Sequence, residues 1–181
     1  MTSFTAQKRV LALDLRPRSF GYAVLEGPNQ LLDWGVRSFR KGVNAVRVPP
    51  SEKLAALLEE YAPSMVVLKE RRLPADKRSG NPRKILGAIQ KEAKRRRVRV
   101  RLLRRRAVQH AFGAQDRFTK HDIASMVAAR FPELAAKLPP KRKPWQSEDY
   151  RMSIFDATAL GVASFGRPAA PSSSPGGLAP P

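Results

Sequence analysis

Three short apolar runs lie close together at the start of the chain, and their spacing constrains the fold more than any other sequence feature. Residues 10–14 (VLALD) are typical of a buried strand, and residues 20–26 and 31–39 predict a second and a third strand. Residues 27–29 (GPN) predict a tight turn between the last two. The third run alternates well enough to pair antiparallel with the second. The chain is therefore expected to begin with an antiparallel three-stranded meander.

After the meander, strands and helices alternate. Strands are predicted at 65–68 and 98–103, a loop at 71–82, and helices at 51–61, 84–97, 107–112, 119–131 and 147–165. Thr119 and Asp122 are spaced as a capping box at the start of one helix. A meander followed by such alternation predicts an α/β fold, a mixed five-stranded sheet flanked by helices.

Length and composition limit the class of protein. The 181 residues suit one domain, expected at 1–165, followed by a Pro-, Ser-, Gly- and Ala-rich tail at 166–181 that is predicted to be disordered. The absence of cysteine excludes disulfides, thiolate zinc sites and cysteine nucleophiles. No apolar run approaches the roughly 18 residues of a membrane span, and the N-terminus lacks a secretory signal. We therefore expect a cytoplasmic protein with no membrane partner.

A formal net charge of +20 and a pI near 11.4 point to a polyanionic partner. Nucleic acid is favoured over a ribosomal or anionic-membrane partner, because residues 83–106 hold twelve Lys and Arg against one acid. Trp145 either stacks on a base or fills the core. The predicted nucleic-acid contacts are Arg83, Lys84, Lys91, Lys94, Arg95, Arg99, Arg101, Lys141, Arg142, Lys143 and Trp145.

Most acidic residues are explained as solvated surface groups, but a few lie inside or next to apolar runs or on the predicted last helix. Asp14 ends an apolar strand, where a carboxylate is costly to bury unless it is paired or bound to a metal. Asp156 lies in the apolar stretch IFDATALGVA of the last predicted helix. Asp149 precedes Asp156 by two helical turns and shares its face, whereas Glu148 lies about 80° further round. Glu70 follows the apolar run at 65–68. Clustered carboxylates in a basic chain suit Mg²⁺ or Mn²⁺, and two such ions can hydrolyse a phosphodiester.

These residues resemble those of a known family. Asp14 followed seven residues later by Gly21-Tyr22, the run at 66–70, and Asp156 with Leu160 resemble, in order, motifs of the RuvC-like Holliday junction resolvases. The bacterial YqgF-like proteins share the first spacing, and the RNase H-like superfamily contains both. The resemblance implies an RNase H-like fold, a homodimer, and hydrolysis of branched DNA with two Mg²⁺ or Mn²⁺ ions. The catalytic and metal-binding residues it implies are Asp14, Glu70, Asp149 and Asp156.

The chain also departs from the family pattern in three places. Arg16 stands where the resolvases have the glycine of Asp-Pro-Gly, and Ser153 stands where the closing motif has a second acid. Lys69 takes the place of the fourth-strand acid, and Glu70 comes one residue later on the opposite face of a regular strand. Two alternatives therefore stay open beside a DNA endonuclease. They are a YqgF-like enzyme acting on RNA, and an RNase H-like protein that binds nucleic acid without cutting it.

Overall fold

The structure is a computed structural model that describes residues 8–41, 46–70, 80–113 and 118–166. The predicted tail lies outside the described residues from 167 onward, and so does the part of the predicted loop at 71–79. No helix in the described ranges is long and apolar enough to cross a membrane.

A five-stranded mixed sheet forms the centre of the molecule, as predicted. Its spatial order is β3-β2-β1-β6-β7, and its strands are β1 (Arg9–Leu15), β2 (Ser19–Glu26), β3 (Leu31–Ser38), β6 (Met65–Lys69) and β7 (Arg99–Leu103). The first three strands pair antiparallel as the expected meander, whereas β6 and β7 run parallel to β1. A two-stranded ribbon, β4 (Arg40–Lys41) with β5 (Val46–Arg47), was not predicted.

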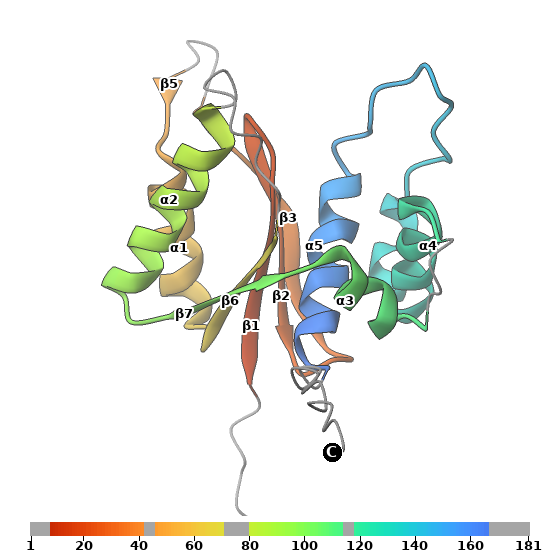
Figure 1. The fold of residues 1–181 in the computed structure, drawn as a ribbon, viewed down its shortest axis with the longest axis horizontal. Helices are drawn as coiled ribbons and strands as arrows, with labels where there is room; N and C mark the ends of the chain where they lie inside the picture. The colour runs from red at the N-terminus through yellow and green to blue at the C-terminus, as the bar shows by residue number, and fades with distance from the viewer. Residues whose placement is uncertain (1–7, 42–45, 71–79, 114–117, 167–181) are drawn as a thin grey trace, which may run out of the picture.

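Helices cover both faces of this sheet (Figure 1). On one face lie α1 (Pro50–Tyr61) and α2 (Gly80–Arg95). On the other lie α5 (Met152–Ser164), with α3 (Arg105–Ala111) and α4 (Lys120–Arg130) packed beside it. A 3-10 helix, η2 (Pro132–Lys137), follows α4, and a connecting loop, residues 138–151, leads from η2 to α5.

Strand alternation divides the apolar side chains between two cores. Leu11 and Leu13 of β1 pack toward α1 and α2, whereas Val10 and Ala12 pack toward α5. Because successive side chains point to opposite faces, Asp14 belongs to the α5 face. The sheet thus presents its first carboxylate to the helix that carries Asp156.

Small residues allow α5 to approach the sheet closely. Gly21 of β2 pairs with Asp14 and lies against the first turn of α5, where a built Cβ would be 2.3 Å from the carbonyl oxygen of Ser153. At Gly161, a built Cβ would be 2.3 Å from a methyl carbon of Leu25. Side chains larger than hydrogen would hold the helix away from the strand ends.

Two predicted helix boundaries are wrong. The last helix begins at Met152 rather than at residue 147, because residues 144–151 form turns and irregular backbone. The second begins at Gly80, inside the predicted loop. By contrast, the capping box is confirmed: the Thr119 hydroxyl accepts from the Asp122 backbone N–H, and the Asp122 carboxylate accepts from that of Thr119.

Candidate active site

Asp14 lies near the carboxyl end of β1, with its side chain only 3% exposed. The parallel strands β1 and β6 end at the same edge of the sheet, and α5 begins beside the sheet at this end (Figure 1). Asp156, in the second turn of α5, is partly buried there. The structure therefore brings together the two acids that the sequence placed on separate elements.

Arg16, in the turn after β1, joins these acids. Its Nε donates to Oδ2 of Asp14 at 2.6 Å, and its Nη2 donates to Oδ2 of Asp156 at 3.1 Å. A third contact runs from Nη1 to Oε2 of Glu148, in the connecting loop. One guanidinium thus binds carboxylates from a strand, a helix and a loop.

Lys120, the first residue of α4, supplies a second cation. Its Nζ donates to Oε1 of Glu148 at 2.8 Å and to Oδ2 of Asp156 at 3.1 Å. We call Asp14, Arg16, Lys120, Glu148 and Asp156 the acid cluster. Its two cations neutralise two of the three carboxylates, which is how a protein accommodates several partly buried acids.

Burial and charge act in opposite directions in this cluster. Burial raises the pKa of Asp14 and the neighbouring Asp156 raises it further, while Arg16 and Lys120 oppose both. Burial also pushes up the pKa of Glu148, but hydrogen bonds from Lys120 and Arg16 outweigh it and hold that pKa at about 2. The pKa values of Arg16 and Lys120 are raised by the carboxylates despite burial, so both remain charged.

Glu70, predicted as a ligand, is the first residue after β6. Its carboxylate accepts from Nε of Arg104 at 2.7 Å and its side chain is 41% exposed. Lys69, the last residue of β6, instead shares the α5 face with Asp14 and lines a small hollow with Asp156. The strand therefore presents a lysine where the family resemblance implies an acid.

Asp149, the other predicted ligand, forms local contacts. Its carboxylate accepts from the backbone N–H of Arg151 at 2.8 Å and from the Arg151 guanidinium at 2.7 Å. The expectation that Asp149 shares a helix face with Asp156 is wrong, because α5 begins three residues after Asp149. Glu148 reaches the cluster instead.

The donor chemistry of the cluster fits a divalent cation. Carboxylate oxygens are the ligands that Mg²⁺ prefers, and Arg16 already acts as a stand-in cation among three of them. Within the described ranges, however, no three His, Cys, Asp or Glu side chains are arranged to hold a metal ion as they stand. A metal ion would therefore have to displace the guanidinium.

The predicted nucleic-acid residues occupy different surfaces. Arg83, Lys84, Lys91, Lys94, Arg95 and Arg99 are exposed on α2 and β7. Arg83 and Lys84 lie near the start of α2, at the same end of the sheet as the acid cluster (Figure 1). Arg101 is half-buried, and it donates from Nη1 to the carbonyl oxygen of Ser164 near the end of α5 at 3.0 Å.

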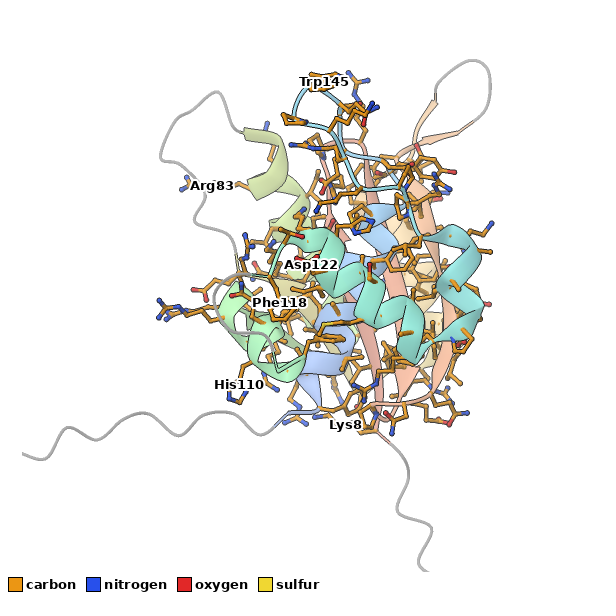
Figure 2. All side chains as sticks on the ribbon, turned by 90° about the vertical axis from the view of Figure 1, so that its right-hand side faces the viewer. Lys8, Arg83, His110, Phe118, Asp122 and Trp145 are labelled. Carbon is orange, nitrogen blue, oxygen red and sulfur yellow. The ribbon has the colours of Figure 1, made fainter. Side chains whose placement is uncertain are left out.

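The connecting loop carries the remaining predicted contacts, Lys141, Arg142, Lys143 and Trp145, and all four are exposed. Trp145 is 79% exposed and lies at the outer edge of the molecule in Figure 2, so its interpretation as a core residue is wrong. The loop also contributes Glu148 to the acid cluster, which joins the basic segment to the carboxylates.

Sequence reasoning missed the two cations and ranked Glu148 below Asp149. The spacing of Arg16, two residues after Asp14, was a detectable signal, since it departs from the family's glycine. Nothing in the sequence distinguished Lys120 from the many other basic residues, because only the packing of α4 against α5 brings it to the cluster.

Comparison with known proteins defines the fold. No protein-family model matches the sequence, and no curated protein matches it at a significant level. Among solved structures, RuvC from Thermus thermophilus in complex with a Holliday junction substrate is similar at a TM-score of 0.62 and 18% identity, covering 87% of this chain and 93% of that one. A second T. thermophilus RuvC structure gives 0.59 at 19% identity, with the same coverage.

The yeast mitochondrial Holliday junction resolvase Ydc2 is similar at a TM-score of 0.55 and 13% identity, covering 91% of this chain and 80% of that one. The sheet order and flanking helices define an α/β protein with the RNase H-like fold. Its fold is similar to that of these RuvC and resolvase structures, as the sequence resemblance predicted.

Proposed function

We propose that this chain is a divalent-metal-dependent endonuclease that hydrolyses phosphodiester bonds in structured or branched DNA. The observation that carries the proposal is the meeting of Asp14, Glu148 and Asp156 around one guanidinium at the carboxyl end of β1. The fold of the RuvC structures, one of them in complex with a Holliday junction substrate, supports the choice of reaction and substrate.

The three carboxylates would hold the metal ion, and each is fixed by a different element. Bound there, Mg²⁺ or Mn²⁺ supplies Lewis-acid stabilisation of the phosphate and a hydroxide nucleophile. Asp14 is held by β1 pairing and by the close approach of α5 at Gly21. Once the ion compensates the carboxylates in their place, Arg16 and Lys120 would add positive charge that draws a phosphodiester toward the site.

Cleavage assays test the proposal. The purified chain is incubated with a four-way junction, a flap, a linear duplex and a structured RNA, each with Mg²⁺, Mn²⁺ or EDTA. We expect Asp14→Asn and Asp156→Asn to abolish metal-dependent cleavage of branched DNA while binding survives. Glu26→Gln is the control, because Glu26 pairs with Arg9 near the opposite end of β1. Intact junction and flap in both metals would refute the hydrolytic proposal, and preferential cleavage of RNA would favour the YqgF-like alternative.

A second candidate is a nucleic-acid-binding protein that does not cut. It is favoured by Lys69 on the α5 face of β6, and by the neutralisation of the carboxylates by Arg16 and Lys120. This candidate predicts salt-sensitive binding that is unaffected by EDTA and retained by Asp14→Asn. The same assays separate the two functions, since only the nuclease converts substrate.

The basic surface and the oligomeric state remain predictions. We propose that Arg83 and Lys84 contact the phosphate backbone together with the connecting loop, because they lie at the same end of the sheet as the acid cluster. A homodimer would suit a junction with two symmetric cuts. Sedimentation of the free chain and of its junction complex measures that state directly.

A further inference from the structure

The connecting loop, residues 138–151, which contributes Glu148 to the acid cluster, also exposes two aromatic side chains. Trp145 is 79% exposed and Tyr150 is 70% exposed. Glu148 lies between them in sequence and contacts Arg16 and Lys120. Trp145 and Tyr150 are three and two residues away from Glu148 in the sequence. Because consecutive Cα atoms are about 3.8 Å apart, only a short length of chain separates each aromatic residue from the acid cluster.

Several contacts hold this loop in a defined conformation. At its start, Nε2 of His121 hydrogen-bonds the carbonyl oxygen of Pro139 at 3.0 Å. At its tip, Gln146 closes a turn on Lys143: the two backbones bond at 3.0 Å, and the Gln146 side-chain oxygen accepts from the Lys143 N–H at 3.0 Å. On the C-terminal side of this tip, the Glu148 carboxylate forms an ion pair with Lys120 and holds the loop against α4. The tip that presents Trp145 is therefore held outward from the body of the protein (Figure 2).

The charge around the rings suits a polyanion. Lys141, Arg142 and Lys143 precede Trp145, and Nζ of Lys143 lies 5.7 Å from the centroid of its ring. Beneath the loop, a hollow of about 880 Å³ is lined by Lys120, Arg142 and Glu148, among others. That volume lies within the range of pockets that take small ligands. A nucleotide in this hollow would lie next to Glu148 and Lys120 of the acid cluster.

We infer that the connecting loop binds unpaired bases, with Trp145 as the main stacking surface and Tyr150 as the second. The inference rests on the nucleic-acid-binding part of the proposed function. Bases inside a duplex are already stacked on their neighbours, whereas an unpaired base has a free face for an aromatic ring. The preferred substrate is therefore DNA with unpaired nucleotides at a gap or branch point, whatever their sequence.

Binding measured in EDTA tests this inference without cleavage. Two fluorescent DNAs of equal length are compared, a continuous duplex and the same duplex with a short single-stranded gap. We expect Trp145→Ala to weaken binding to the gapped DNA by about tenfold more than binding to the duplex. Gapped DNA should also quench a component of tryptophan emission that is present in the wild type and missing in the variant.

Two control variants define what the aromatic ring contributes. Leu102→Ala removes another exposed apolar side chain, on β7, and should leave both affinities unchanged. Arg142→Ala removes a charge from the same loop, and should weaken both complexes equally and reduce their salt dependence.

The outcomes separate this inference from the proposed function. Equal losses on the two DNAs, or no loss, for Trp145→Ala would overturn the inference even if the chain cuts junctions. A selective loss in a chain that cuts nothing would support it, and only the hydrolytic part of the proposed function would then fail.

Discussion

Replacing Arg16 by alanine tests whether its guanidinium is the cation that holds the acid cluster together. The substitution removes three hydrogen-bonded ion pairs at once and leaves Lys120 to compensate three carboxylates. The charged form of Asp14 should be destabilised more than that of the other two acids, because its side chain is 3% exposed and Arg16 Nε lies 2.6 Å from its Oδ2. The variant should therefore lose stability when no metal is present.

The size of this loss follows from the burial of the partners. Removing one partner of a buried ion pair costs about 3–5 kcal/mol. The Arg16 side chain is 21% exposed, which favours the lower end, about 3 kcal/mol. For a chain of 181 residues this corresponds to a fall in Tm of about 6–12 °C in EDTA.

Metal should reverse the loss if the carboxylates accept a divalent cation. An ion present at a hundred times its Kd adds about 2.7 kcal/mol, close to the stability lost. In the wild type the ion must first displace the guanidinium, so its affinity should be lower, by about a hundredfold at most. Mn²⁺ should therefore raise the Tm of Arg16→Ala far more than that of the wild type.

The assay is thermal unfolding in EDTA and in a Mn²⁺ titration, with calorimetry for the affinity itself. Arg9→Ala is the matched control, because Arg9 also lies on β1, pairs with Glu26 at 2.8 Å, and is remote from the cluster. It should lose stability without gaining any response to Mn²⁺. An Arg16→Ala chain that is as stable as the wild type in EDTA, or that responds to Mn²⁺ no more than the wild type, would refute this role for Arg16.

Three further predictions concern the surroundings of the cluster. Glu148→Gln should lower metal-dependent cleavage at least about tenfold, whereas Asp149→Asn, which disturbs only the pairing with Arg151, should change it little; the reverse order would restore Asp149 as the ligand. Gly21→Ala should destabilise the fold by about 1–3 kcal/mol in urea unfolding, because its Cβ would meet the Ser153 backbone. The pKa of Glu148 is held at about 2, below the ordinary 4.5, so its contribution is present above pH 4.5 and is lost as the pH falls toward 2. Between pH 5 and 3, unfolding measurements should therefore show the wild type losing roughly 1–2 kcal/mol more than Glu148→Gln.

The sheet and most of the helices could be predicted from the sequence because their signals are local. Apolar runs, alternation and the turn at 27–29 defined the meander. The strand at 65–68 followed from a short apolar run, and the strand at 98–103 followed from alternation. The start of α5 was not predictable in the same way. Ser147 and the acids after it resemble a helix start, but the chain forms turns there and reaches the helix only at Met152.

The site residues, too, are partly predictable from the sequence and partly decided by the tertiary structure. Asp14 and Asp156 could be selected from the sequence, because a carboxylate inside an apolar run of either element requires a partner. Which partners they have was decided by tertiary structure: α5 packs against Gly21, α4 brings Lys120, and the connecting loop returns Glu148 to the end of β1. Charged side chains on separate segments carry no periodicity that relates them to one another. Only the folded chain, by burying the acids together, determines which cations must lie between them.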